Sequence, residues 1–281
     1  MTKVLTGLVL LALLGCTAPP KSSTAARQEA AIEANRKGEN YVRHGDLENA
    51  ARSYREALRL SQSLEDADGI GANAINLSIV RQRQGRFADA RSTLGLISED
   101  SRVRFSPQRL AEASLRLALL DLDERRFPSA GEWLSRSNNY CAGRCPLSSA
   151  IHNVRAQLAL QAGRVDEAAA AARSAHDASR AAGDRAELAN ALRLLGITAL
   201  KRADAATARS HLEQALELDR ELGAPRKIAL DLLGLGRVAA LGGDAEAARA
   251  YYARALAVSE ADRDSVGAAE ARAMLDAAAG K

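Results

Sequence analysis

The sequence predicts an all-α protein, a solenoid of six helix pairs followed by a C-terminal capping helix. Three observations lead to this fold class. Helix-favouring Ala, Leu, Arg and Glu dominate the 281 residues, whereas aromatic residues make up only 3%. A pattern of small residues recurs six times at an interval of about 40 residues. Each recurrence is centred on a turn-like position that is usually glycine, the residue that best ends a helix in the left-handed conformation.

The repeat is defined by columns of residues counted from the turn. The turn positions stand 40, 40, 38, 40 and 40 residues apart: Gly45, Gly85, Arg125, Gly163, Ala203 and Gly243. Five residues after each turn comes an alanine: Ala50, Ala90, Ala130, Ala168, Ala208 and Ala248. Seven residues before each turn comes a small residue: Gly38, Ser78, Ala118, Ala156, Gly196 and Gly236. Nine residues after the turn the column reads Tyr54, Leu94, Leu134, Ala172, Leu212 and Tyr252. Small residues let two antiparallel helices approach closely, and the larger residues fill the gap between neighbouring pairs.

The helices follow in order from these columns. The expected pairs are 27–43 with 47–64, 69–84 with 87–98, 107–124 with 127–139, 147–162 with 165–182, 184–201 with 205–222, and 225–241 with 245–260. A last amphipathic stretch, Ser265 to Ala279, is expected to cover the open end of the stack.

Segments such as GENYVRHGDLENAARSYREAL and GRVAALGGDAEAARAYYARAL resemble tetratricopeptide repeats. They carry the family's small, aromatic, Gly–Asp, Ala, Tyr and Ala columns at the proper offsets. The usual repeat has 34 residues, so this chain resembles the long-period class of the family, in which both helices are extended. The resemblance implies a right-handed superhelix that binds other proteins and has no catalysis of its own. A HEAT-type solenoid is the alternative, because it shares the period but not the Gly–Asp turn.

The first residues have the features of a signal peptide. Lys3 precedes an apolar run that ends in Leu13-Leu14-Gly15-Cys16, and this run is too short to span a bilayer. The tetrad resembles the bacterial lipobox, which implies cleavage before Cys16 and acylation of that residue. We therefore expect a signal peptide over 1–15, a lipidated N-terminus and tether over 16–26, and the solenoid over 27–281. Thr17 is not acidic, which favours the outer membrane, facing the periplasm. An ordinary secretory leader with a chance cysteine is the alternative.

In this family the first helix of each pair usually lines a concave binding surface. Carrying the positions ten, six and two residues before each turn onto this chain gives eighteen candidates: Asn35, Glu39, Arg43, Ile75, Ile79, Arg83, Leu115, Leu119, Asp123, Asn153, Gln157, Gln161, Arg193, Ile197, Lys201, Leu233, Arg237 and Leu241. The principal groove candidates are Arg83, Asn153, Gln157, Arg193, Ile197, Lys201 and Arg237. We expect Arg193, Lys201 and Arg237 to be cations that contact an acidic partner and whose removal leaves stability unchanged. For Leu115 and Leu119 a place in the core between repeats is equally compatible.

The cysteines and the histidines are the residues that could form a disulfide, bind a metal or take part in catalysis. Cys141 and Cys145 lie in a loop with Gly and Pro between the third and fourth repeats, which favours a structural disulfide in an oxidising periplasm. The spacing disfavours a redox site, and further metal ligands are lacking nearby. His44, His152, His176 and His211 each fit a polar helix position or a turn. No phosphate-binding loop or nucleophile motif is present, so we expect no enzyme activity and no cofactor.

These features favour a membrane-tethered periplasmic scaffold that binds a partner protein or peptide. The net charge of +4 is spread over interleaved acidic and basic residues, which argues against a nucleic-acid surface. Three more specific versions resemble pilotin lipoproteins of type IV pilus and secretin assembly, adaptors that bring proteases to cell-wall hydrolases, and the lipoprotein of the barrel-assembly machinery. A regulatory subunit of a cell-envelope enzyme is an alternative from a different class. The sequence leaves the partner and the oligomeric state open.

Overall fold

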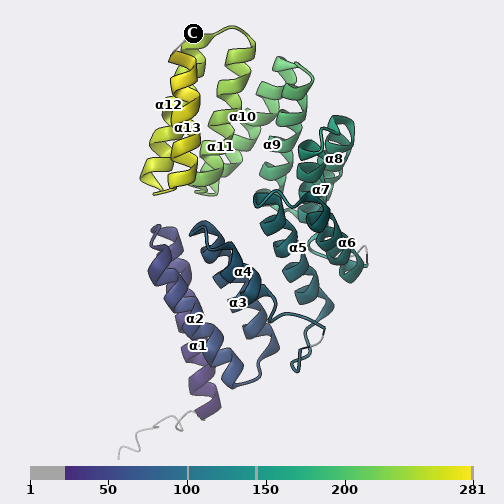
Figure 1. Ribbon diagram of the computed structural model, residues 1–281, viewed down its shortest axis with the longest axis vertical. Coiled ribbons are helices and arrows are strands. Elements are labelled where there is room, and N and C mark those ends of the chain that lie inside the picture. The colour runs from purple at the N-terminus through teal and green to yellow at the C-terminus, as the bar shows by residue number, and fades with distance from the viewer. Residues whose placement is uncertain (1–22, 100, 143–144, 280–281) are drawn as a thin grey trace, which may run out of the picture.

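A computed structural model describes the chain except for residues 1–22, 100, 143–144 and 280–281 (Figure 1). The expected signal peptide, Cys16 and the first part of the expected tether therefore lie outside the described residues. The described part holds thirteen helices and no strand. They are α1 (Ser23–Arg43), α2 (Leu47–Ser63), α3 (Ala67–Arg83), α4 (Phe87–Leu94), α5 (Pro107–Asp123), α6 (Phe127–Cys141), α7 (Ser148–Gln161), α8 (Val165–Ala182), α9 (Arg185–Lys201), α10 (Ala205–Glu221), α11 (Pro225–Leu241), α12 (Ala245–Ala261) and α13 (Ser265–Ala279). The predicted stack of six pairs and a terminal helix is confirmed.

Two helix boundaries differ clearly from the expectation. Helix α1 begins at Ser23, so residues 23–26 are helical and not part of a tether, since alanines at 25 and 26 favour helix. Helix α4 ends at Leu94 and not at 98. Gly95 follows at once and weakens the helix, and the chain then turns back so that Ile97 is buried in the same apolar cluster as Leu94.

Each pair turns through a residue with positive φ at the predicted position. The four turn glycines have φ between 70° and 78°, where a Cβ is disfavoured: Gly45, Gly85, Gly163 and Gly243. Arg125 and Ala203 adopt φ of 58° and 59° despite their side chains. After three of these turns an aspartate caps the second helix by accepting a hydrogen bond from a backbone N–H: Asp46, Asp204 and Asp244.

Within a pair, a large side chain of the second helix lies on a small residue of the first. A Cβ at Gly38 would lie 2.6 Å from the Tyr54 ring, and a Cβ at Gly196 would lie 2.6 Å from Leu212 Cγ. Gly236 meets the ring of Tyr252 in the same way. The alanine column five residues after the turn is at most 1% exposed. The predicted close approach of the two antiparallel helices is confirmed.

Stacking of the pairs creates an inner and an outer layer. First helices of adjacent pairs contact each other, as α7 contacts α9 and α9 contacts α11. Second helices of adjacent described pairs make no such contacts, so they splay apart on the outside of a curved superhelix. Figure 1 shows the curve, with the first pair and the last pair brought to the same side of the molecule. The first helices therefore form the concave face, as the family resemblance implied.

The last helix, α13, has charged side chains on the face that a further helix would cover. Where α11 places Leu232 and the small Gly236 toward its partner helix, the corresponding residues of α13 are Arg272 and Asp276. Arg272 Nη2 lies 2.7 Å from Glu260 Oε1. These polar side chains replace the apolar face that a further helix would cover, which fits the expected role as a cap. Among the described helices, none is both long and apolar enough to cross a bilayer.

The contact between Gly236 and Tyr252 makes a prediction. Gly236→Ala is expected to lower the free energy of unfolding by about 1–3 kcal/mol, because the added methyl overlaps a buried ring. Gly131→Ala is the matched control, since nothing lies within 4 Å of its added Cβ in α6. The control is expected to gain up to about 1 kcal/mol from helix propensity. Urea denaturation followed by circular dichroism measures both, and equal behaviour of the two variants would refute the close-packing account.

Candidate functional site

The eighteen predicted groove residues fall into two sets. All those two or six residues before a turn are exposed or half-buried, as a binding surface requires. Those ten residues before a turn are different, because four of the six are buried: Leu115, Asn153, Arg193 and Leu233. The prediction that this third column lines the groove is therefore wrong for Asn153, Arg193 and Leu233, and Leu115 takes the place in the core that was equally compatible with its sequence.

The column ten residues before the turn belongs to the junction between repeats. In the first, third and fifth junctions its side chains lie with two other columns: the residue sixteen after the same turn, and the residue twelve before the next turn. In the first junction Asn35 Nδ2 donates to Asn73 Oδ1 at 2.6 Å, and Asn73 Nδ2 donates to Ser61 Oγ at 3.2 Å. In the third junction the corresponding residues, Leu115, Cys141 and Ile151, are apolar and share one buried cluster. The first and third junctions thus match polar with polar and apolar with apolar, respectively.

The fifth junction holds a buried ion cluster. Arg193 Nε lies 2.7 Å from Asp231 Oδ1, and a second guanidinium nitrogen pairs with Asp219. All three side chains are at most 8% exposed. Burial raises the pKa of Asp231 to about 7, although the charge of Arg193 opposes this shift. Burial, with Arg193 nearby, also lowers the pKa of Lys227 to about 8. Arg193 is a structural cation here, which corrects the expectation that it contacts a partner.

Other predicted groove residues are engaged within the chain. Asn153 Nδ2 donates to Glu187 Oε2 at 2.7 Å and is buried. Arg237 Nη2 pairs with Glu270 Oε1 of α13 at 3.0 Å, although both side chains stay 43% exposed. Lys201 is exposed, and Gln157 and Ile197 are half-buried. Of the principal groove candidates in the later repeats, these last three remain available to a partner.

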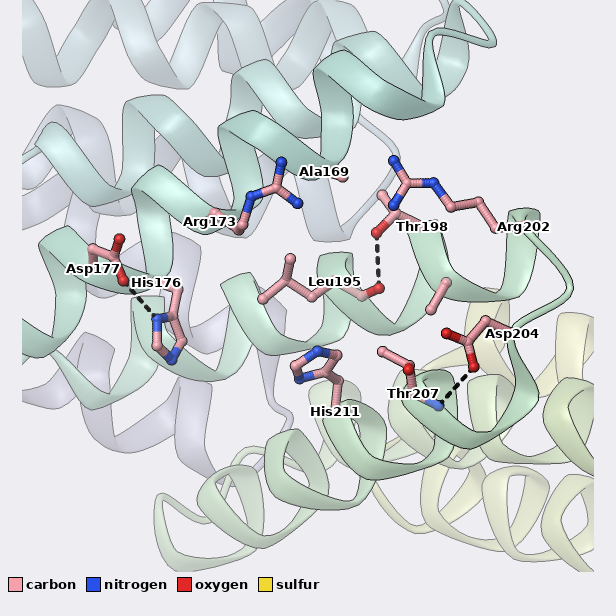
Figure 2. A pocket seen from close by; sticks show the side chains of 11 residues that line it. Ala169, Arg173, His176, Asp177, Leu195, Thr198, Arg202, Asp204, Thr207 and His211 are labelled. Carbon is pink, nitrogen blue, oxygen red and sulfur yellow. Dashed lines mark hydrogen bonds and ion pairs between the residues drawn. The ribbon is translucent and has the colours of Figure 1, made fainter.

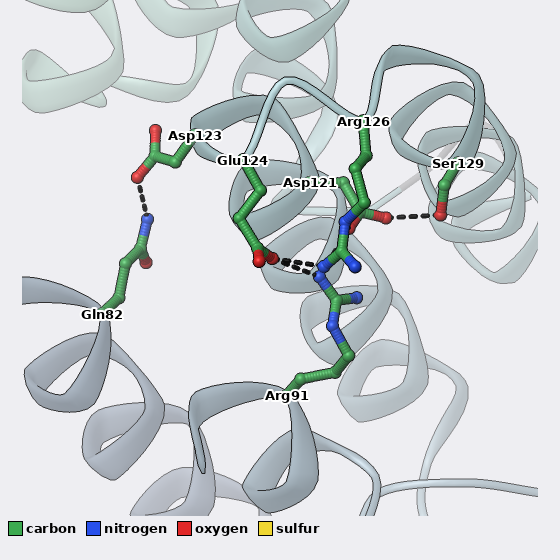
Figure 3. Close-up of polar contacts among 7 residues, drawn as sticks. All are labelled: Gln82, Arg91, Asp121, Asp123, Glu124, Arg126 and Ser129. Carbon is green, nitrogen blue, oxygen red and sulfur yellow. Dashed lines mark hydrogen bonds and ion pairs between the residues drawn. The ribbon is translucent and has the colours of Figure 1, made fainter. Parts of the chain in front are cut away.

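A polar network ties the second repeat to the third beside the short helix α4 (Figure 3). The carboxylate of Asp121 is fully buried, and Arg126 Nε lies 3.0 Å from it. Arg91 of α4 bridges Asp121 and Glu124, at 2.8 Å from the latter. Gln82 Nε2 donates to Asp123, another predicted groove residue, at 2.6 Å. This network joins repeats at a point where the shortened α4 provides less apolar contact.

The two ends of the superhelix meet at Arg83. Its Nη2 lies 3.6 Å from Oδ2 of Asp262, the residue that follows α12, and the side chains are only 20% and 12% exposed. On the same side, a Cβ at Gly45 would lie 3.3 Å from the carbonyl oxygen of Asp262. The turn of the first pair therefore touches the turn before α13, which closes the curve seen in Figure 1. Arg83, a predicted groove residue, is instead engaged in this end-to-end contact, which we call the clasp.

The concave face opens into a cavity of about 430 Å³ between α1 and α3. Amide side chains dominate its polar lining: Gln28, Asn35, Asn73 and Asn76. Glu39 and Asp66 add negative charge, and Ile32 adds an apolar side chain that is 69% exposed. Within the described residues, the amides of Gln28 and Asn76 have no hydrogen-bond partner. The sequence-based set included Asn35 and Glu39 but missed Asn76, which lies one residue beyond the column that was carried over.

The sulfurs of Cys141 and Cys145 lie at disulfide-bonding distance, with their Cα atoms 5.1 Å apart, as predicted. The pair links the end of α6 to the segment before α7, where the repeat period shortens. Among the described residues, no group of three or more His, Cys, Asp or Glu side chains is arranged to hold a metal ion.

Comparison with known proteins agrees with this architecture. Tetratricopeptide-repeat family models match residues 34–64 and 147–221. The chain contains tetratricopeptide repeats. No curated protein matches this tetratricopeptide-repeat chain by sequence.

Three solved structures illustrate the likeness of fold. A Rap protein complexed with Competence and Sporulation Factor is 15% identical, with a TM-score of 0.64 over 88% of this chain and 70% of that one. A signal transduction ATPase with a tetratricopeptide-repeat sensor from Pyrococcus horikoshii is 16% identical, with a TM-score of 0.62 over 92% of this chain and 38% of that one. BtubC from P. vanneervenii is 22% identical, with a TM-score of 0.54 over 84% of this chain and 92% of that one. At these identities the likeness shows the fold.

The buried cluster around Arg193 makes a prediction opposite to that for a surface cation. Arg193→Gln is expected to lower the free energy of unfolding by about 3–5 kcal/mol, because it leaves buried carboxylates without their cation. The pKa of Asp231 is already raised to about 7. A group with a raised folded-state pKa loses stability as pH rises through that value, so the defect is expected to be smaller near pH 5 than near pH 8.

Unfolding midpoints at the two pH values measure this effect. Arg202→Gln is the control, because its side chain is 45% exposed and pairs with an aspartate that is 95% exposed. We expect it to cost less than about 1 kcal/mol. A mild, pH-independent effect of Arg193→Gln would show that the buried cluster does not stabilise the junction.

Proposed function

We propose that this chain is a non-catalytic scaffold, tethered to the outer membrane and facing the periplasm, that binds an extended segment of a partner protein on its concave face. The cavity between α1 and α3 is the principal subsite. A tetratricopeptide-repeat fold indicates a protein-interaction scaffold, and a Rap protein of similar fold is complexed with Competence and Sporulation Factor. For this chain, the observation that supports the proposal is the set of amide side chains in the cavity.

Amides suit an extended peptide because each carries both a donor and an acceptor. A peptide main chain presents an N–H and a C=O at nearly every residue, and each must find a partner when water is displaced. Gln28 and Asn76 are unpaired in the cavity, whereas Asn35 and Asn73 are held in place by the first junction. Ile32, which is 69% exposed, offers an apolar contact at the same place. The subsite therefore combines main-chain recognition with one hydrophobic anchor.

Along the rest of the concave face, Gln157, Ile197 and Lys201 extend the surface that a longer segment would contact. Lys201 adds a positive charge there, opposite in sign to Glu39 and Asp66 of the cavity. We therefore propose that the bound segment carries a basic or neutral part at the α1–α3 end and an acidic part toward α9.

The membrane tether rests on the leader and on Cys16. Helix α1 begins seven residues after Cys16, and an extended chain of that length spans at most about 25 Å. Gln28 and Ile32 lie in the first turns of α1. Acylation of Cys16 would hold the cavity close to the lipid surface, so the partner segment would be bound near the membrane.

Selection of peptides from a displayed random library against the mature protein tests the subsite. Peptides that depend on the cavity are expected to lose about tenfold in affinity, near 1.4 kcal/mol, when Asn76 is changed to Ala. Asn138→Ala removes an exposed amide from the outer helix α6 and is expected to change nothing. Selected peptides that bind both variants as well as the parent protein would contradict the proposed subsite.

Labelled fatty acid tests the tether. The parent protein is expected to incorporate the label and to fractionate with outer membranes, and Cys16→Ala is expected to abolish both, because the thiol is the attachment point. Equal labelling of the two proteins, or labelling of neither, would show that the lipobox resemblance misleads.

A further inference from the structure

A second cavity lies on the outer side of the superhelix, away from the concave face. It occupies about 370 Å³ between the second helices α8 and α10, with α9 at its base (Figure 2). This volume is at the lower end of the range for small-molecule sites, which begins near 300 Å³. The cavity is lined by His176 and Arg173 of α8, by His211 of α10 and by residues of α9. We expected both histidines at ordinary polar positions, but the structure half-buries them here.

The repeats themselves show why this space is unfilled. His176 stands thirteen residues after its turn, a position that is leucine in three of the other five repeats: Leu58, Leu216 and Leu256. Ala172 occupies the column that is Tyr or Leu in all other repeats. After Val165, every apolar residue of α8 is alanine. In the fourth repeat, large apolar side chains are therefore missing from the outer groove, and imidazoles and a guanidinium surround the space. Departures of this kind from a structural pattern are typical of functional sites.

The acidic groups of the cavity already have partners. Asp204 Oδ1 accepts the backbone N–H of Thr207 at 3.0 Å and caps α10. Asp177 Oδ1 lies 3.0 Å from His176 Nδ1. Arg202, at the end of α9, pairs with Asp166 outside the lining. Each contact engages one oxygen of its carboxylate, which keeps its negative charge, and the side chain of Asp177 is 82% exposed to solvent.

The donors are less well satisfied. Within the described residues, Arg173 has no carboxylate partner, and Figure 2 shows its guanidinium above Leu195, next to Ala169. His211 Nδ1 is buried and has no hydrogen-bond partner. Burial, and secondarily the neighbouring His176, lowers the pKa of His211, so this imidazole is neutral near pH 7. An anion in the cavity would pair with Arg173 and would supply the charge that favours protonation of His211.

We propose that this outer cavity binds a compact anion, a carboxylate or a phosphate, with Arg173 as its cationic partner and His211 as a hydrogen-bond donor. Guanidinium groups pair with both kinds of anion through two parallel hydrogen bonds. His176 and the hydroxyl of Thr207 also line the cavity. The site is distinct from the peptide subsite of α1 and α3 and does not depend on it.

Titration of the mature protein with inorganic phosphate and, separately, with succinate tests this proposal. The imidazole resonances of His176 and His211 report on binding by NMR. Saturable shifts at millimolar anion are expected for at least one probe, and phosphate alone or succinate alone would identify the class. Binding of succinate is expected to be tighter near pH 6 than near pH 7.5, because the bound anion raises the pKa of His211.

Three variants complete the test. Arg173→Gln is expected to weaken binding at least tenfold, whereas Arg180→Gln, an exposed position two turns further along α8, leaves binding unchanged. His211→Ala, which places there the residue found at the equivalent position 171, is expected to weaken binding and to remove most of its pH dependence. Each variant must retain the parent's circular dichroism spectrum. Absence of saturation with both probes, or equal binding by Arg173→Gln, would overturn the proposal.

Discussion

The close contact between a small residue of one helix and a large residue of the next sets the geometry of the whole molecule. Because Gly38, Gly196 and Gly236 have no Cβ, the side chains of Tyr54, Leu212 and Tyr252 lie directly on the backbone of the partner helix. The two helices of a pair are thereby fixed at one distance and one angle. Stacking six such units brings the first helices together inside and separates the second helices outside. Both candidate sites follow from this arrangement, one in each layer.

Much of the fold could be predicted because its determinants are local. The features that define a helix pair are a left-handed turn, a helix cap and a small residue. All three act within the pair, so each requires a particular residue type at a fixed offset from the turn, and that residue type recurs in the six repeats. The junction between repeats was harder to predict. Helical periodicity predicts that Arg193 and Lys201 share a face of α9. The first helix of a pair has neighbouring helices on several sides, however, and periodicity does not predict which of them a given side chain contacts. The partners of Arg193 lie 26 and 38 residues away. The same two offsets, counted from Asn35, lead to Ser61 and Asn73, so the pattern of the first junction predicts Asp219 and Asp231 as the neighbours of Arg193.

The candidate sites were less predictable for a related reason. Each histidine was judged on its own helix, where a polar residue near the surface is unremarkable. Only comparison between repeats shows that His176 replaces a leucine and that α8 lacks the bulk to fill the space. Asn76 was missed because the carried-over positions describe an average groove, and Asn76 lies one residue away from the nearest of them. In a repeat protein the other copies serve as an internal reference, and departures from them are informative.

The clasp between Arg83 and Asp262 gives this solenoid a property that open ones lack. An open array tolerates the gain or loss of a whole unit, since each unit contacts only its neighbours. Here the turn at Gly45 contacts the turn at Asp262, so one unit more or one fewer would move these two turns out of contact. The number of repeats therefore decides whether the two ends meet, as the number of blades decides whether a β-propeller closes. Duplication of a repeat, ordinarily an easy step in the evolution of such proteins, would cost this chain the contact that joins its two ends.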